Sequence, residues 1–333
     1  MFKNKIFFIT GGTGSFGKYF TKYLLKNSEV GKIIIFSRDE LKQFNMKNDP
    51  EFLKYSKKLR FFIGDIRDKD RLKYAFNQKI DYVIHAAALK QVPIAEYNPS
   101  EAIKTNINGA QNIVDLTLNN KIEKVISLST DKAASPINLY GATKLASDKI
   151  IIAANNYSKK TRFSVVRYGN VFASRGSVVP FFIQQKKKGF ITITDKKMTR
   201  FNISLDEAVK LVLFAIKSSV GGEIYVPKIP SYKITDLAKA IAPNVPIKIV
   251  GIRPGEKLHE EMITVADSKN TLEFDNHYII KPNSEFYNWD LKNYLKKIKN
   301  KKYKYVNENF SYNSFNNKDY LSVVQLKKII SNM

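Results

Sequence analysis

The chain has 333 residues, 44% of them hydrophobic and 26% charged, which excludes a disordered chain and predicts a sizeable core with a second, smaller lobe. No apolar run reaches the roughly 20 residues that span a bilayer, and cysteine is absent, so we expect a cytoplasmic protein with no membrane insertion and no metal. The formal charge of +26 would suit nucleic acid, but the basic residues are spread along the whole chain, so we expect a Lys-coated surface and no nucleic-acid partner.

Six short apolar runs alternate with helix-length segments in the first half of the chain. They lie at residues 6–9, 33–36, 59–63, 82–85, 125–128 and 163–166. Near-continuous apolar strands are typical of a parallel sheet that helices cover on both faces. The sequence therefore predicts an α/β fold with a doubly wound parallel sheet, a Rossmann domain over residues 1–167.

Helices are predicted to begin near Ser15, Asp68, residues 98–100 and Tyr140, where capping residues or a first-turn proline stand. After residue 167, glycine and proline punctuate shorter elements. We expect residues 168–333 to form mainly a smaller α/β substrate lobe and a C-terminal tail. A return to the first domain is expected near residues 195–220.

A glycine-rich turn follows the first strand and opens the first helix, with glycines at positions 11, 14 and 17. Glycine is needed where the backbone turns sharply and approaches a pyrophosphate, which binds the free N–H groups at the helix start. The turn therefore predicts a dinucleotide cofactor. Its expected contacts are Gly11, Thr13, Gly14, Ser15, Phe16 and Gly17.

The end of the second strand bears on the choice between NAD and NADP. An Asp or Glu there would bind the ribose 2′-hydroxyl of NAD, whereas this chain has Ser37 and Arg38, with Lys42 one helical turn further on. Arginine pairs with a 2′-phosphate and stacks on adenine, so we expect NADP. The alternative is a surface arginine in an ion cluster with Asp39 and Glu40.

Two other segments are candidates for contact with the cofactor. Asp65, just after the third strand, is placed to accept a hydrogen bond from the adenine amino group or to cap the next helix. The small residues 86–88 at the end of the fourth strand would let the cofactor lie against the backbone, or would serve tight strand–helix packing.

Tyr140 and Lys144 stand four residues apart, on one face of a predicted helix. We expect the lysine to lower the phenol pKa, so that the phenolate takes a proton from an alcohol while nicotinamide accepts hydride from the same carbon. After a glycine-rich turn and the fifth strand, this pair indicates an oxidoreductive site.

Together these motifs resemble the extended short-chain dehydrogenase/reductase family, over nearly the whole chain. Residues 129–132, Ser-Thr-Asp-Lys, place an acidic side chain next to a second group that can transfer a proton. This segment resembles that of sugar-nucleotide 4,6-dehydratases, whereas 4-epimerases usually carry small hydroxylated residues there. The chain resembles the C5-inverting UDP-N-acetylglucosamine 4,6-dehydratases that begin pseudaminic acid synthesis. Segments 37–43, 85–90, 168–171, 174–180 and 251–257 carry the same likeness.

The resemblance implies the roles of four catalytic residues. Tyr140, assisted by Lys144, would take the O4 proton while C4 loses hydride to NADP. Lys132 would then remove the C5 proton and Asp131 would help the 6-hydroxyl leave as water; hydride returns to C6, and C5 is reprotonated from the opposite face. A lysine base needs a lowered pKa, which we expect Lys144 and the cationic nicotinamide to supply. The alternative is a capping Asp131 and a solvated Lys132.

The resemblance also implies the remaining contacts and a homo-oligomer, either a dimer or a hexamer. The further cofactor contacts are expected at Ser37, Arg38, Asp39, Glu40, Leu41, Lys42, Asp65, Ile66, Ala86, Lys90, Asn106, Tyr140, Lys144 and Val171. The substrate contacts are expected at Lys90, Asn170, Arg175, Gly176, Ser177, Val178, Val179, Thr199, Arg253 and Glu256. Without the resemblance, each substrate contact could equally be an ordinary surface residue.

Three other functions are weighed against this one. An inverting dehydratase of the N-acetylfucosamine branch commonly lacks the tyrosine, so Tyr140 favours the pseudaminic branch. A UDP-hexose 4-epimerase is disfavoured by Asp131 and Lys132. A non-catalytic NADP-binding protein is disfavoured by the intact set of Tyr140, Lys144 and Asp131.

Overall fold

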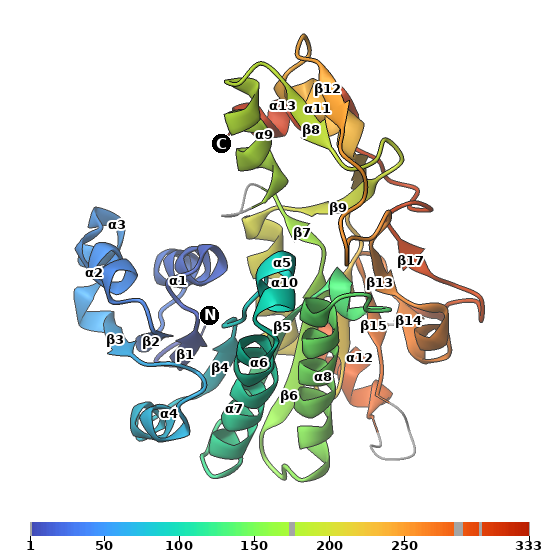
Figure 1. Cartoon of the computed structure of the whole chain (residues 1–333). Helices are drawn as coiled ribbons and strands as arrows, with labels where there is room; N and C mark the ends of the chain where they lie inside the picture. The colour runs from blue at the N-terminus through green and yellow to red at the C-terminus, as the bar shows by residue number, and fades with distance from the viewer. Residues whose placement is uncertain (1, 173–176, 283–288, 300–301, 333) are drawn as a thin grey trace.

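The centre of the molecule is a ten-stranded sheet in a computed structural model that describes residues 2–172, 177–282, 289–299 and 302–332. Seven neighbouring strands are parallel (Figure 1). In sheet order they are β3 (Leu59–Ile63), β2 (Lys32–Ser37), β1 (Ile6–Thr10), β4 (Tyr82–His85), β5 (Lys124–Thr130), β6 (Arg162–Tyr168) and β10 (Ile224–Pro227). The six predicted strands and the doubly wound sheet are confirmed.

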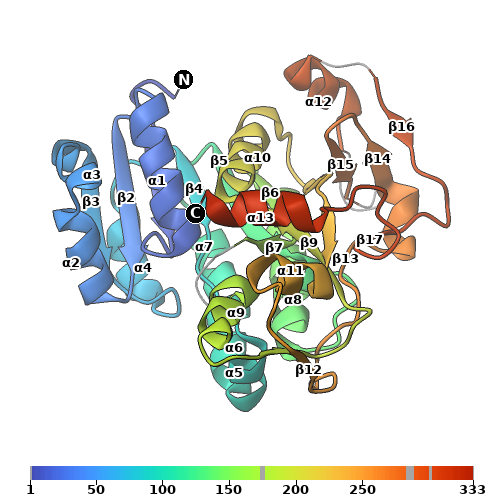
Figure 2. The same ribbon diagram turned by 90° about the horizontal axis from the view of Figure 1, so that it is seen from above.

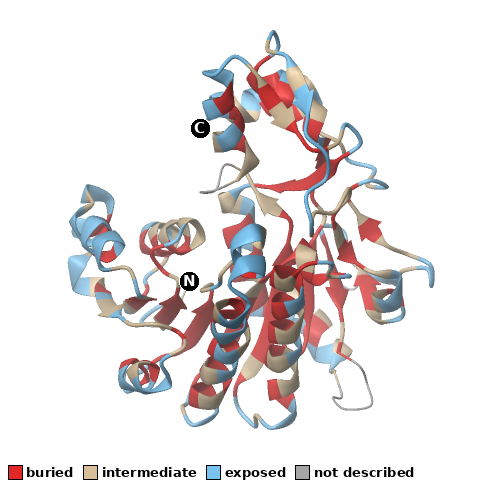
Figure 3. Cartoon of the chain, in the orientation of Figure 1, coloured by how far each residue is buried: buried red, intermediate tan, exposed pale blue. Residues whose placement is uncertain are grey.

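Helices cover both faces of this sheet (Figure 2). One face carries α1 (Ser15–Asn27) and α10 (Leu205–Ser218); the other carries α4 (Lys69–Phe76), α7 (Gly109–Leu118) and α8 (Leu139–Ala153). The parallel strands between the two helix layers are largely buried (Figure 3), which explains why they read as continuous apolar runs. Side chains fix the helix starts: Asp68 caps α4 and Asn138 caps α8.

Shorter helices connect these layers. They are α2 (Glu40–Asn48) and α3 (Pro50–Leu53) between β2 and β3, and α5 (Val92–Tyr97), α6 (Pro99–Ile103) and the π-helical turn η2 (Lys104–Asn108) before α7. Three antiparallel strands extend the sheet beyond β10, and a helix lies between two of them in the chain. They are β15 (His277–Ile280), β14 (Thr271–Glu273), β16 (Lys304–Tyr305) and α12 (Leu291–Ile298).

A smaller lobe lies above the carboxyl ends of the parallel strands in Figure 1. It contains α9 (Val178–Lys186), β8 (Ile191–Ile193), α11 (Ile234–Ile241), β12 (Ile247–Ile249) and α13 (Val323–Ser331). It has its own apolar core, which includes Val179, Phe182, Leu237 and Leu326. The strands β7 (Asn170–Val171), β9 (Thr199–Ile203) and β11 (Ser231–Lys233) form a three-stranded sheet, and β13 (Glu261–Ile263) pairs with β17 (Tyr312–Asn313).

The segment after residue 167 does not stay in the smaller lobe. The chain returns to the main sheet through α10, which lies within the expected range 195–220, and through β10, which follows that range. It returns again through β14, β15 and β16. The division into a cofactor domain and a substrate lobe stays a prediction. Within the described part of the chain, no helix has the length and apolarity to cross a membrane.

Candidate active site

A cavity of about 1070 Å³ lies where the main sheet meets the smaller lobe. It extends from the glycine-rich turn after β1 to α9 and β9. Its floor lies between β1 and β4, where the strand order reverses. Open α/β sheets bind their ligands at such switch points.

The glycine-rich turn packs tightly against the end of β4 and against itself, where only glycine fits. Gly11 has a φ of +64°, and a Cβ there would lie 2.9 Å from the Ala87 nitrogen. A Cβ on Gly17 would lie 2.5 Å from the α-carbon of Gly12. Gly14 is the N-cap of α1 and provides no side-chain cap, which leaves first-turn amides for an anion. This geometry fits a dinucleotide pyrophosphate.

Arg38 lies at the rim of the cavity with 57% of its side chain exposed, 3.7 Å from the Asp65 carboxylate. Asp65 is held mainly by Arg67, at 2.9 and 2.7 Å. Burial opposes the ionisation of Asp65, but the hydrogen bonds from Arg67 outweigh it and lower its pKa. The interpretation of Asp65 as a helix cap is wrong because Asp68 caps α4.

The cavity brings together most of the residues that the sequence singled out. It is lined by Gly11, Thr13, Gly14, Ser15, Phe16, Gly17, Ser37, Arg38, Asp39, Lys42, Asp65, Ile66, Ala86, Lys90, Lys132, Tyr140, Lys144, Asn170, Val171, Ser177, Val178, Val179, Arg253 and Glu256. Glu40, Leu41, Asn106, Asp131 and Thr199 do not line it. Arg175 and Gly176 lie outside the described residues.

Two of the residues that do not line the cavity support its walls. The Asn106 amide accepts from the Leu89 nitrogen at 2.8 Å and donates to the Leu89 oxygen at 2.9 Å and to Thr143 at 3.0 Å, which fixes the loop before Lys90 against α8. The buried Thr199 hydroxyl lies 2.7 Å from the Ser314 hydroxyl.

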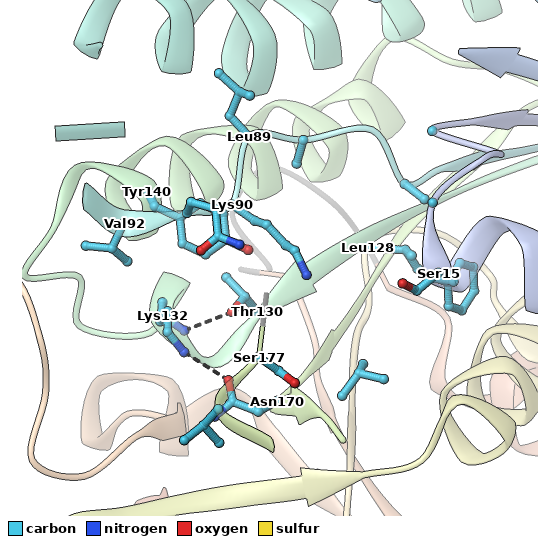
Figure 4. Close-up of a pocket in the computed structure, with 18 of the residues that line it drawn as sticks. Ser15, Leu89, Lys90, Val92, Leu128, Thr130, Lys132, Tyr140, Asn170 and Ser177 are labelled. Carbon is cyan, nitrogen blue, oxygen red and sulfur yellow. Dashed lines mark hydrogen bonds between the residues drawn. The ribbon is translucent and has the colours of Figure 1, made fainter. Parts of the chain in front are cut away.

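Asp131 and Lys132 begin the turn η3 (Asp131–Ala133) directly after β5. Asp131 is fully buried. The Lys132 ammonium lies 3.0 Å from one Asp131 oxygen, 3.0 Å from Glu260 and 3.3 Å from the Asn170 amide oxygen. Lys132 and Asn170 face one another in Figure 4, and Lys90 reaches into the same space. An ammonium has three donors, so these three partners satisfy it.

The expected lowering of the Lys132 pKa is wrong for this site. Burial disfavours the ammonium, but the carboxylates of Asp131 and Glu260 outweigh burial and raise the pKa above its ordinary value. Lys144 does have a lowered pKa, because it is buried and Asp148 compensates only in part. The charge state of Lys132 is therefore set by its carboxylate neighbours.

The expected lowering of the Tyr140 pKa is wrong as well. Burial raises the pKa of the phenol to about 12, although the positive charge of Lys132 opposes this. Lys144, one helical turn away, does not offset the cost of ionising a phenol that is out of contact with water. Lys132 is the cation that favours the phenolate.

Sequence reasoning missed Glu260, and it assigned no contact to Arg200. Arg200 lines the cavity, and its Nε lies 3.6 Å from the buried Glu260 carboxylate. No local signal separates Glu260 from its neighbour Glu261, which bonds Ser135 near the surface. Among the described residues, no cluster of three or more His, Asp or Glu side chains is placed to hold a metal.

The Rossmann sheet, the glycine-rich turn and the Tyr140–Lys144 pair define an extended short-chain dehydrogenase/reductase. The chain belongs to the polysaccharide biosynthesis protein family, whose model matches residues 7–282. It is 55% identical to a Campylobacter jejuni protein named UDP-N-acetylglucosamine 4,6-dehydratase (inverting), over 99% of this chain and 98% of that one.

The chain is also similar to a protein named as an epimerase and to a protein of known structure. It is 45% identical to a Rickettsia bellii protein named UDP-glucose 4-epimerase, over 84% of each chain. The X-ray structure of Pen from Bacillus thuringiensis has a TM-score of 0.88 at 37% identity, covering 100% of this chain and 98% of that one. The fold thus matches an experimental structure over its whole length.

Proposed function

We propose that the protein catalyses the C5-inverting 4,6-dehydration of UDP-N-acetylglucosamine to UDP-2-acetamido-2,6-dideoxy-β-L-arabino-hex-4-ulose, with NADP as its retained cofactor. The observation that carries this proposal is the hydrogen-bonded Asp131–Lys132 pair, in which Lys132 lines the cavity with Tyr140 and Asp131 is buried next to it. The likeness to the Campylobacter dehydratase over almost both entire chains supports it.

The residues of the glycine-rich turn would hold the pyrophosphate of NADP, and Arg38 would meet its 2′-phosphate. The start of α1, which no side chain caps, and the cavity that the turn lines support this placement. Bound NADP would supply a nicotinamide that takes hydride from C4 and returns it to C6. Lys90 and Arg253 line the same cavity and would meet the substrate's phosphates or sugar.

Tyr140 would take the O4 proton as C4 is oxidised, because Lys132 is the cation that favours its phenolate. The resulting C4 ketone acidifies the C5 hydrogen, so elimination can follow. Lys132 as an amine removes the C5 proton and becomes an ammonium. The C5–H electron pair first forms an enolate with the C4 carbonyl; it then forms the C5–C6 double bond as the C6–O bond breaks, and Asp131 gives its proton to the departing oxygen, which leaves as water.

Once C4 is oxidised, elimination needs a state of the pair in which Asp131 is an acid and Lys132 an amine. Transfer of one proton from Lys132 to Asp131 along their 3.0 Å hydrogen bond produces that state. Burial raises the pKa of Asp131 and favours this transfer, whereas the carboxylates of Asp131 and Glu260 raise the pKa of Lys132 and oppose it. Elimination then restores the ion pair.

A 4-epimerase is the second candidate, because the relatives named UDP-glucose 4-epimerase are 45% identical. Incubation with UDP-N-acetylglucosamine in deuterated water, followed by NMR, separates the two. A 4-keto-6-deoxy sugar with deuterium at an inverted C5 supports the dehydratase, and a C4 epimer supports the epimerase. Unchanged substrate would contradict both.

We also propose that the protein acts in the pseudaminic pathway, whose product would reach flagellin or another surface glycan. We expect it to be a homo-oligomer in the cytoplasm. The resemblance of the chain supports them. Assay of the product with an aminotransferase of the pseudaminic branch or of the N-acetylfucosamine branch would distinguish the two pathways.

A further inference from the structure

Glu260 lies behind the catalytic pair, in the segment just before β13. It is 2% exposed. Its Oε1 lies 3.0 Å from the Lys132 ammonium and 3.6 Å from Nε of Arg200. Both partners line the cavity, whereas Glu260 lies behind them and, like Asp131, does not line it.

The backbone holds Glu260 in a fixed place. Its N–H donates to the Ser314 hydroxyl at 2.9 Å, and its carbonyl accepts from the Ser314 nitrogen at 2.7 Å. Ser314 is fully buried, and its hydroxyl lies 2.7 Å from that of Thr199 on β9. Thr199, predicted from the sequence to contact substrate, therefore supports the segment before β13 that carries Glu260.

Glu260 and Asp131 share the ammonium of Lys132, yet their environments differ. Burial raises the pKa of Asp131, and the charge of Glu260 adds to this effect while Lys132 opposes it. Burial also disfavours the ionised Glu260, but Lys132 and Arg200 outweigh it and lower the pKa of Glu260. When the surroundings of two carboxyl groups shift their pKa values in opposite directions, the two groups take different roles in proton transfer.

We propose that Glu260 is a positioning residue that stays ionised throughout the reaction as the fixed counter-charge of Lys132, so that, of the two carboxyl groups beside Lys132, only Asp131 exchanges a proton with the substrate. This inference rests on the proposed dehydratase function. When Lys132 takes the C5 proton and becomes an ammonium, Glu260 stabilises the new charge at 3.0 Å. Asp131, relieved of that task, gives its proton to the leaving oxygen.

Several groups contribute to the charge state of Lys132. Asp131 and Glu260 raise its pKa, and Arg200 lowers it. Lys132 is also coupled electrostatically to Lys90 in the loop after β4, to Tyr140 on α8, to Tyr232 on β11 and to Lys257 before β13. Glu260 supplies a negative charge from outside η3, so removing it must lower the pKa of Lys132.

The first test is the pH dependence of kcat/KM for Glu260→Gln, Glu260→Asp and the control Glu261→Gln. Glu261 is the adjacent carboxylate, and it bonds Ser135 instead of Lys132. On the alkaline limb the Asp131–Lys132 pair loses its shared proton, so this limb follows the pKa of Lys132. We expect it to move down by about one pH unit or more in Glu260→Gln and to return toward wild type in Glu260→Asp. It should stay in place in Glu261→Gln. Activity lost with an unmoved alkaline limb would overturn the proposal.

The second test needs no turnover. The Nζ resonance of Lys132 in protein labelled with ¹⁵N-lysine, assigned by its loss in Lys132→Met, is titrated in wild type and in both Glu260 variants. We expect the amine to deprotonate at lower pH in Glu260→Gln, and at an intermediate pH in Glu260→Asp, which also serves if the glutamine variant does not fold. An unchanged titration would overturn the role of Glu260, whereas a wild type without dehydratase activity would overturn only the proposed function.

Discussion

Gly141 on α8 packs directly against the backbone of Lys132, so closely that any Cβ at Gly141 would collide with the Lys132 carbonyl oxygen. The Asn138 side chain, the N-cap of α8, accepts from the Gly141 nitrogen at 2.8 Å and fixes the same turn. The helix that carries Tyr140 is thereby set against the turn that carries the acid–base pair.

Gly141→Ala is expected to push these two elements apart. Since a displacement of about 1 Å can cost roughly 100-fold in rate, we expect kcat/KM to fall by about that factor. Overpacking of this kind costs about 1–3 kcal/mol, which urea denaturation would measure. Ala142→Ser, at the exposed neighbouring position, is the control, and near-normal activity of Gly141→Ala would contradict the packing argument.

Asp131→Asn is expected to separate proton removal from loss of water. Asparagine keeps the size of the buried side chain but cannot act as an acid, so we expect kcat to fall by about 100-fold or more. Lys132 would still exchange the C5 hydrogen. In deuterated water, NMR should therefore find deuterium at C5 in recovered substrate faster than product forms.

Lys132→Met is the matched comparison for this experiment. It removes the base, so neither exchange at C5 nor product is expected. Exchange that persists in Lys132→Met, or disappears in Asp131→Asn, would reverse the assignment of base and acid.

The parts of the fold that depend on local pattern could be predicted from the sequence. The six apolar strands and the cap at Asp68 follow from periodicity and capping chemistry, which act within a few residues. The glycine-rich turn and the Tyr140–Lys144 spacing located the cavity for the same reason.

The electrostatics of the site could not be predicted in this way. Lys132 and Glu260 are 128 positions apart and meet only because the segment before β13 folds back over the end of β5. The pKa expectations for Lys132 and Tyr140 failed because they considered sequence neighbours and omitted burial and this distant carboxylate. Tertiary packing therefore decides which groups can carry protons here.

Arg38→Asp is expected to change the cofactor preference. Arg38 lies at the cavity rim, where an aspartate would repel a 2′-phosphate and accept from a 2′-hydroxyl. We expect the ratio of NADP to NAD affinity to fall at least about tenfold, measured by titration of cofactor-free protein.

Lys47→Asp makes the same change of charge at an exposed position near the end of α2. It controls for the general loss of positive potential, because Lys47 does not line the cavity. An equal effect of the two variants, or an unchanged preference in Arg38→Asp, would contradict the assignment of NADP through Arg38.

His277→Phe is expected to reduce the loss of stability in acid. His277 lies buried in β15, stacked on Phe274 and 3.0 Å from the Tyr294 hydroxyl. Burial is the main cause that lowers its pKa from 6.5 to about 4. Between these pH values the unfolded chain binds more protons than the folded protein, so the free energy of unfolding falls as the pH falls, by at most about 3 kcal/mol for this group.

The variant loses the hydrogen bond to Tyr294, so we expect it to be less stable than wild type at pH 7.5, by about 1 kcal/mol. Urea denaturation at pH 7.5 and pH 4.5 should nevertheless show a smaller difference between the two pH values than in wild type. Part of the acid sensitivity should remain, because burial also lowers the pKa of His85, to about 3. If both proteins lose the same free energy on acidification, His277 is not neutral in the folded state at pH 4.5, and the packing around it does not exclude its charged form.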